Sequence, residues 1–251
     1  MDRPAISAKL DTALAVFQLL SGASAPALPR HRHDLSRDDV RESQRARVLA
    51  AAIDLFGANG YATTTVLDIA KRAGVSRKTF YELYDTKEDV FLDAYQAVGV
   101  LVSRSGLAPR DNAATTATPD DLEPFARRLL TVLATTPEAT RMFFLEALGA
   151  GPSVRRRRAE AVNEFVDSLG PILSALRGRA DPASGELSRA HCHLVVAGGI
   201  ELITEYLADH DPAELPDLTS VLAEVVRVVV LPNLEPVAPT PRRKKRASPD
   251  V

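Results

Sequence analysis

Apolar residues recur at the spacing of an α-helix from Ser43 onward. In the first such segment they are Val48, Leu49, Ala52, Leu55 and Phe56. Positions three and four residues apart lie on one side of a helix, so this pattern predicts a helix with one buried face. The sequence Ala-Asn-Gly follows it. We expect Gly60 to end the helix, because glycine adopts the left-handed conformation of a helix cap at little cost.

Two short helices are predicted directly after the first. Thr65 and Asp68 have the spacing of a capping box, in which each side chain accepts a hydrogen bond from the other residue's free backbone N–H. Residues 73–75 (Ala-Gly-Val) predict a tight turn, and Ser76 is placed to cap a third helix. The third helix is expected to bury the apolar residues Phe80, Leu83 and Tyr84.

Longer helices are predicted in the rest of the chain. Their approximate ranges are 86–103, 120–135, 137–149, 152–177, 186–209 and 217–230. The polar segment APRDNAATTATPD is expected to be a loop, and residues 21–36 mix Ser, Pro, Ala and basic residues without a period, as linkers do. The final segment, VAPTPRRKKRASPDV, has the composition of a disordered tail.

The composition favours helices packed on helices. The chain of 251 residues is 45% hydrophobic and 25% charged, which is ordinary for a globular protein, but it has no Trp and only 5% aromatic residues. Sheets are enriched in aromatic and β-branched residues, whereas Ala and Leu are strong helix formers. An all-α fold is therefore predicted.

The cysteine and histidine residues do not predict a disulfide or a metal site. The single cysteine, Cys192, excludes an intrachain disulfide and a four-cysteine metal site, and it fits a reducing cytoplasm. His191 and His193 flank it, but residues two apart on a helix point in different directions, so we do not expect them to share a metal ion. The sequence predicts no metal and no cofactor.

The N-terminus loosely imitates a signal peptide, with TALAVFQLL followed by SGASAPA. However, Asp2 and Asp11 lie where positive charge is expected, and a short amphipathic helix before a linker is the preferred interpretation. Glu201 and Glu205 interrupt the longest apolar stretch elsewhere, so no segment is expected to cross a membrane. A cytoplasmic protein is predicted.

The third helix carries the candidate chemistry. If it buries Phe80, it turns Arg77, Lys78 and Tyr81 to the opposite side. The formal net charge of the whole chain is −2, yet six basic against three acidic residues give residues 43–84 a charge of +3. Two short helices at a glycine turn form a helix-turn-helix, which fits the major groove of DNA. The alternative is a solvated helix face that happens to be basic.

Residues 51–91 resemble the DNA-binding unit of the TetR/AcrR family of transcriptional regulators. The matching residues, in order, are Phe56, Gly60-Tyr61, Thr65, Ile69-Ala70, Ala73-Gly74-Val75-Ser76, Thr79-Phe80-Tyr81 and Lys87-Glu88. The resemblance implies phosphate contacts near Thr65, Tyr81, Tyr84 and Lys87. It implies base contacts from Arg77, Lys78 and Thr79 on the helix that Ser76 caps. The chain departs from the family pattern at Lys78, where glycine is frequent, and at Tyr84, where phenylalanine is usual.

The resemblance also implies the remaining organisation. The expected parts are an N-terminal extension and linker (1–40), a helix-turn-helix domain (41–86), a helical effector-binding and dimerisation domain (87–232) and a disordered basic tail (233–251). The last two long helices of each subunit are expected to form a four-helix dimer interface. The interface candidates are Leu194, Val195, Gly198, Gly199, Leu202, Val221, Val225 and Val229. The alternative is that these residues make an internal core contact.

An effector site in the second domain is implied as well. Its candidate lining residues are Phe125, Leu129, Met142, Phe143, Leu145 and Phe165, with Glu146 or Glu201 as polar anchors. An aromatic and Met stripe at helical spacing is more often plain core. The basic run at 155–158 is most simply a row of salt bridges, whereas the run Arg242–Arg246 could contact phosphates without sequence preference.

The function predicted from these features is a sequence-specific, ligand-responsive repressor that binds a palindromic operator as a homodimer. A DNA-binding regulator without effector control is one alternative. A helical enzyme is another, but the sequence has no Gly-rich phosphate loop, no HExxH motif, no G-x-S-x-G turn and no credible Cys–His pair.

Overall fold

The computed structural model describes residue 16, residues 37–107 and residues 118–231, and everything regular in these ranges is helical. The predicted N-terminal linker, the basic tail and most of the polar loop therefore lie outside the described residues. No helix in the described part is long and apolar enough to cross a membrane. The all-α fold is confirmed.

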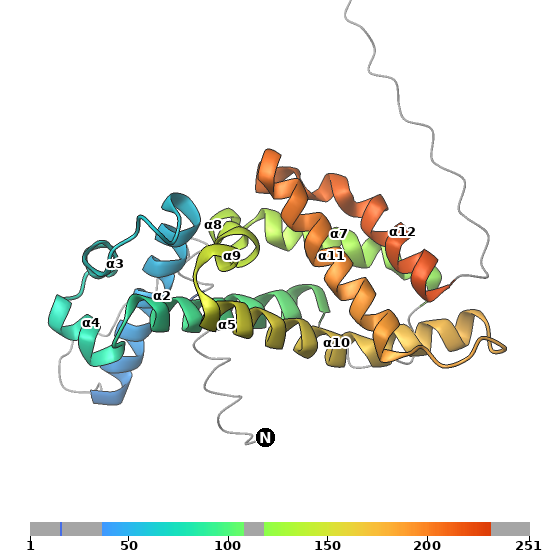
Figure 1. The fold of residues 1–251 in the computed structure, drawn as a ribbon, viewed down its shortest axis with the longest axis horizontal. Coiled ribbons are helices and arrows are strands. Elements are labelled where there is room, and N and C mark those ends of the chain that lie inside the picture. The colour runs from blue at the N-terminus through green and yellow to red at the C-terminus, as the bar shows by residue number, and fades with distance from the viewer. Residues whose placement is uncertain (1–15, 17–36, 108–117, 232–251) are drawn as a thin grey trace, which may run out of the picture.

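The three N-terminal helices form a compact unit at one end of the molecule (Figure 1). They are α2 (Arg37–Asn59), α3 (Val66–Ala73) and α4 (Arg77–Leu83). Their shared core consists of fully buried side chains, namely Leu49, Ile53, Phe56, Ile69 and Phe80. As the sequence indicated, α2 ends at Gly60, which has a φ of 88° and donates its N–H to the carbonyl of Phe56 at 2.9 Å.

The helix α5 (Lys87–Leu107) leads from this unit into a second helical domain, where it packs against α7 and α10 (Figure 1). The other elements of the domain are η1 (Pro119–Asp121), α7 (Leu122–Ala134), α8 (Pro137–Arg141), η2 (Met142–Glu146), α9 (Ala147–Gly149), α10 (Pro152–Ala180), α11 (Arg189–Asp209), η3 (Pro212–Leu218) and α12 (Thr219–Val230). The helices α11 and α12 lie side by side in the second domain, away from α4 (Figure 1).

Two elements differ from the sequence-based expectation. The helix α2 begins at Arg37 rather than near Ser43; its first turn is exposed and carries Asp38 and Asp39, which stabilise a helix start without any apolar pattern. The single helix expected over 137–149 is divided, because Met142–Glu146 forms a π turn between α8 and α9. One extra residue in a helical turn shifts the side chains that follow it to another face.

The two domains meet most closely where α8 crosses α2. A Cβ atom added to Gly57 would lie 2.0 Å from the carbonyl oxygen of Glu138. Only glycine allows the backbones to approach this closely, so Gly57 fixes the separation of α2 and α8. The base of the three-helix unit is thereby packed directly against the second domain.

Gly57→Ala should destabilise the protein, although alanine is the better helix former by about 1 kcal/mol. The added methyl group has to push α8 away from α2, and the strain exceeds the gain in helix propensity. Gly178→Ala in α10 is the matched control, because its Cβ would meet nothing within 4 Å. We expect a lower thermal midpoint for the first variant and an equal or higher one for the second. An increase in both midpoints would contradict the close approach.

Candidate nucleic-acid interface

The helix α3 begins at a complete capping box, as predicted. Thr65 Oγ1 accepts a hydrogen bond from the Asp68 N–H at 3.2 Å, and Asp68 Oδ2 accepts from the Thr65 N–H at 3.0 Å and from its hydroxyl at 2.6 Å. These hydrogen bonds lower the pKa of Asp68 below its ordinary value. The carboxylate therefore stays ionised at neutral pH and complements the partial positive charge at the start of the helix.

The turn between α3 and α4 depends on Gly74. Its φ of 65° lies in the left-handed region, and it closes α3 by donating its N–H to the carbonyl of Lys71 at 3.2 Å. Ser76 then caps α4, as predicted, because its Oγ accepts a hydrogen bond from the Thr79 N–H at 3.0 Å. The hydroxyls of Ser76 and Thr79 are also 2.9 Å apart and share a hydrogen bond. Both predicted DNA-binding residues thus shape the start of α4.

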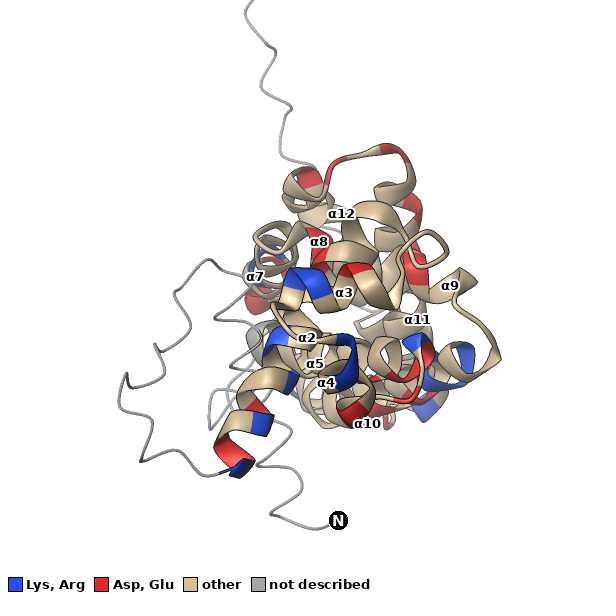
Figure 2. Ribbon diagram, turned by 90° about the vertical axis from the view of Figure 1, so that its left-hand side faces the viewer, with Lys and Arg blue, Asp and Glu red and all other residues tan. Residues whose placement is uncertain are grey.

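The outer side of α4 is cationic. Phe80 is fully buried, whereas Arg77, Lys78 and Tyr81 are exposed. The Lys78 side chain is 87% exposed, and its ammonium lies 3.7 Å from the carboxylate of Glu82 one turn later. Arg77 has no hydrogen bond or ion pair with any residue that the structure describes. Figure 2 faces this end of the molecule and shows Lys and Arg on α2, α3 and α4.

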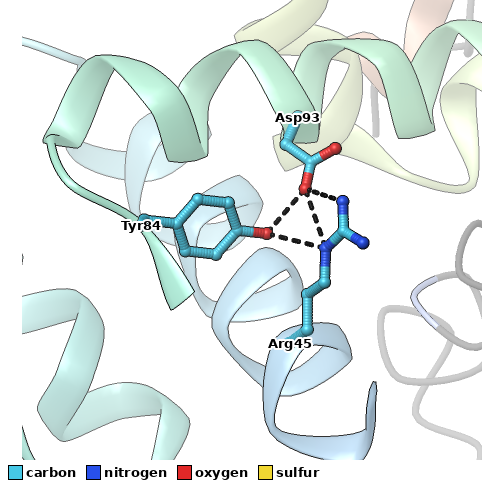
Figure 3. Close-up of polar contacts among 3 residues, drawn as sticks. All are labelled: Arg45, Tyr84 and Asp93. Atoms are coloured by element: carbon cyan, nitrogen blue, oxygen red, sulfur yellow. Dashed lines mark hydrogen bonds and ion pairs between the residues drawn. The ribbon is translucent and has the colours of Figure 1, made fainter. Parts of the chain in front are cut away.

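Tyr84 at the end of α4 does not lie on this surface. It is only 8% exposed, and its hydroxyl donates a hydrogen bond to Asp93 Oδ2 of α5 at 2.6 Å (Figure 3). Arg45 of α2 donates to the same carboxylate oxygen from its NH2 group at 2.7 Å and from Nε at 3.1 Å, and Nε also lies 3.3 Å from the Tyr84 hydroxyl.

This cluster of Arg45, Tyr84 and Asp93 ties three helices together. Burial and the negative charge of Asp93 raise the pKa of Tyr84 above its ordinary value, so the hydroxyl keeps its proton and remains a donor. Burial opposes the charge on Arg45, but the hydrogen bonds to Asp93 and Tyr84 outweigh it and raise its pKa. The cluster therefore joins α2, the end of α4 and α5 at neutral pH.

Lys87 is also turned inward. Its Nζ donates hydrogen bonds to the carbonyl oxygens of Tyr61 at 2.7 Å and Thr64 at 3.0 Å, and it lies 4.2 Å from the centre of the Tyr61 ring. The phosphate contacts expected of Tyr84 and Lys87 stay predictions, and in this structure the polar atoms of both side chains have internal partners. We assign both residues to the frame that holds α3 and α4.

The effector candidates fall into three environments. Met142, Phe143 and Phe165 are buried in the second domain, and the ring of Phe143 stacks on Tyr95 with 4.3 Å between the centroids. Three others, Phe125, Leu129 and Leu145, are partly buried against the same core. The two expected polar anchors are engaged elsewhere: Glu146 accepts a hydrogen bond from the Tyr61 N–H at 2.7 Å, and Glu201 is an exposed partner of Arg158 at 4.0 Å.

The dimer candidates divide between an internal and an exposed side of α11 and α12. Val195 and Gly199 are buried, and a Cβ on Gly199 would lie 3.2 Å from Leu222, so these two make contacts within the subunit. On the exposed side, Leu194 and Val221 are 58% and 48% exposed. Gly198, Leu202, Val225 and Val229 are partly exposed.

Sequence reasoning missed several residues of these sites. Arg45, Asp93 and Tyr95 were not singled out, and Val228, 60% exposed on α12, was absent from the dimer candidates. Val228 lies three residues after Val225 and seven after Val221, which is the spacing of one helix face, so the sequence did contain a signal for it.

In the basic run at 155–158, Arg157 pairs with Glu164 at 3.0 Å, as expected for a row of salt bridges. The described residues include no group of three or more His, Cys, Asp or Glu that could hold a metal ion.

Tyr84→Phe should lower the free energy of unfolding by about 1 kcal/mol, because the ring stays in place while the partly buried cluster loses a hydrogen bond. Asp93→Ala should cost more, roughly 2 kcal/mol, since it leaves both Tyr84 and Arg45 without their acceptor. Urea denaturation measures both values. Tyr81→Phe is the control, because the Tyr81 side chain is exposed. A Tyr84→Phe protein as stable as the wild type would show that the cluster contributes nothing.

Comparison with known proteins points to one family. Residues 48–94, which run from α2 through α3 and α4 into α5, match the family model for bacterial regulatory proteins, tetR family. The chain is 28% identical to the HTH-type transcriptional regulator EthR of Mycolicibacterium smegmatis over 206 residues, which cover 79% of this chain and 89% of EthR. Two further curated HTH-type regulators are 39% and 37% identical, but they are matched over only 29% and 27% of their own lengths.

Solved structures share the fold. FadR from Bacillus subtilis in complex with stearoyl-CoA has a TM-score of 0.58 and 21% identity, covering 74% of this chain and 97% of that one. FadR from Thermus thermophilus, a TetR-family transcriptional repressor in complex with lauroyl-CoA, has a TM-score of 0.53 and 26% identity, covering 78% of this chain and 98% of that one. Residues 48–94, with the capped helix-turn-helix, therefore form a DNA-binding domain of the TetR family of transcriptional regulators, and the second domain shares the fold of the TetR-family structures.

Proposed function

We propose that the protein is a ligand-responsive repressor that acts in the cytoplasm and binds a palindromic DNA operator as a homodimer. The observation that carries this proposal is the exposed cationic surface of α4, formed by Arg77 and Lys78 while Phe80 anchors the helix in the core. A single helix fits into the major groove of B-form DNA. The turn at Gly74 keeps α3 behind it, as in other helix-turn-helix proteins.

The residues of α4 are suited to different parts of the DNA. Arg77 and Lys78 lie in its first turn, from which recognition helices contact base edges, and both side chains can donate to O6 and N7 of guanine. The methyl group of Thr79 can pack against a thymine methyl. Tyr81 carries an exposed hydroxyl that can donate to a phosphate oxygen. Thr65 is exposed at the start of α3, where free backbone N–H groups can donate to a phosphate, and both contacts would fix the position of α4 in the groove.

The homodimer is supported by an apolar stripe at the opposite end of the molecule. Its residues lie on the exposed sides of α11 and α12 and are Leu194, Gly198, Leu202, Val221, Val225 and Val228. A Cβ on Gly198 would meet nothing within 4 Å, so a helix of a second subunit could approach closely there. Two-fold symmetry would then place two α4 helices about 34–36 Å apart, one turn of DNA.

A long-chain acyl compound is the effector class that we propose. The FadR of Thermus thermophilus, 26% identical to this chain, was solved with lauroyl-CoA. In this chain the second domain holds a buried group of aromatic residues and a methionine, in which Phe143 stacks on Tyr95 and contacts Phe144. Unbranched Met side chains adapt to apolar ligands of different shapes, and Met142 is part of this group.

The DNA contacts can be tested by selecting duplexes from a random-sequence pool with the wild-type protein. We expect inverted repeats, since each half-site would bind one subunit. Arg77→Ala should weaken binding to the selected duplex by roughly tenfold or more, because a bidentate contact to guanine is worth about 1–3 kcal/mol. Arg128→Ala, which removes an exposed arginine of α7, is the matched control. If both variants bind like the wild type, α4 is not the recognition helix.

The effector class can be tested on the same protein–DNA complex. Adding lauroyl-CoA should release the protein from the selected duplex, while free coenzyme A at the same concentration should not, because the acyl chain supplies the apolar contacts. Phe143→Ala should reduce the response to lauroyl-CoA and leave the affinity for DNA within about threefold. A complex that no acyl-CoA releases would indicate a regulator without this form of effector control.

A further inference from the structure

The turn between α2 and α3 is held from two sides. From α5, Lys87 Nζ donates to the carbonyl oxygens of Tyr61 and Thr64. From the second domain, the carboxylate of Glu146 accepts a hydrogen bond from the Tyr61 N–H, with 2.7 Å between the nitrogen and Oε2. Because this turn ends at Thr65, its position determines where α3 begins.

The hydrogen bond between Glu146 and Tyr61 has no substitute among the described residues. Tyr61 follows Gly60, whose own N–H closes α2 on the carbonyl of Phe56, so the next N–H has no acceptor in the helix. Glycine at position 60 leaves room for the carboxylate, because a Cβ there would lie 3.3 Å from Glu146 Oε2. A charged acceptor makes a shorter and stronger hydrogen bond than a neutral one.

Glu146 is the last residue of the π turn η2, which lies between α8 and α9. The preceding residues of this turn, Met142, Phe143 and Phe144, are buried in the core of the second domain. A carboxylate that holds the DNA-binding unit is therefore attached to the segment with the stacked ring of Phe143. π turns are frequently found at functional sites, and a small change in their winding moves the residue at their end.

We propose that Glu146 is a positioning residue for DNA binding, which couples the π turn of the second domain to the start of α3 through the backbone N–H of Tyr61. In this arrangement Glu146 does not contact the effector or the DNA. A shift of the π turn weakens the hydrogen bond, leaves the turn between α2 and α3 held only from the side of Lys87 among the described residues, and thereby lowers the affinity for DNA. The proposal rests on the function proposed above and adds the group that connects its two sites.

Glu146→Ala tests this coupling, because the loss of a negative charge and the loss of the hydrogen bond change the affinity for DNA in opposite directions. Removing a carboxylate from a DNA-binding protein is ordinarily expected to tighten binding, because repulsion of the phosphates is reduced. We expect the opposite: Glu146→Ala should bind the selected duplex about tenfold more weakly, as for the loss of one charge-assisted hydrogen bond. Glu146→Gln should stay within about threefold of the wild type, because its side-chain carbonyl still accepts from the N–H.

A second measurement reports on the contact itself. Hydrogen–deuterium exchange of peptides covering residues 57–66 should be faster in Glu146→Ala than in the wild type, and close to the wild type in Glu146→Gln. Glu123→Ala is the matched control, because Glu123 pairs with Arg127 on the same helix α7. It should change neither the exchange nor the affinity.

Several outcomes would overturn the inference. They are a Glu146→Ala protein that binds DNA as tightly as the wild type or more tightly, unchanged exchange over residues 57–66, or a Glu146→Gln protein as impaired as Glu146→Ala in both measurements. Failure of the proposed function would look different, because the wild type itself would then select no duplex. The exchange measurement decides the role of the contact in that case, and thermal unfolding of each variant identifies any loss of the fold.

Discussion

The burial of Phe80 is the constraint on which the DNA-binding unit depends. The helix α4 spans only Arg77–Leu83, and a helix of this length is not stable by itself in water. Full burial of a Phe side chain contributes about 1.5–3 kcal/mol, whereas a helix cap such as Ser76 contributes about 1 kcal/mol. Packing therefore determines which side of α4 faces outward, and the cap determines where the helix begins. With Phe80 inside, Arg77 and Lys78 are exposed at the start of α4.

The features that the sequence predicted well are those determined within a few residues. The capping box at Thr65, the left-handed glycines and the Ser76 cap are local, because each depends on side chains within four positions. The internal partners of Tyr84 and Lys87 were not predicted, for the opposite reason. The decisive partners are distant along the chain: Asp93 is 48 residues from Arg45, and Tyr61 is 26 residues from Lys87. Local periodicity indicates that a polar group is near the surface but not which partner it has.

In the second domain, too, the sequence predicted the helices but not the contacts that their side chains make. The ranges expected for α11 and α12 agree with Arg189–Asp209 and Thr219–Val230, since both ends are marked by polar residues or proline. The division of apolar residues between the subunit core and the exposed stripe was not predictable, because the neighbours Leu194 and Val195 are both aliphatic and yet one is exposed and the other buried. The π turn was missed as well, although the run Met142–Phe144, buried without interruption, departs from the period of a regular helix.

The contacts between the two domains differ in how they can respond to a ligand. The approach of Gly57 to the Glu138 carbonyl is a steric contact between backbones, which cannot be lengthened gradually without opening a gap in the packing. The hydrogen bond from Tyr61 to Glu146 is a single directional interaction that can break while α2 and α8 remain packed. Allosteric coupling free energies are typically about 1–3 kcal/mol, and a hydrogen bond to a charged group contributes about 1.5–3 kcal/mol. One such bond is therefore large enough to account for coupling between the domains, provided that the steric contact keeps them together in both states.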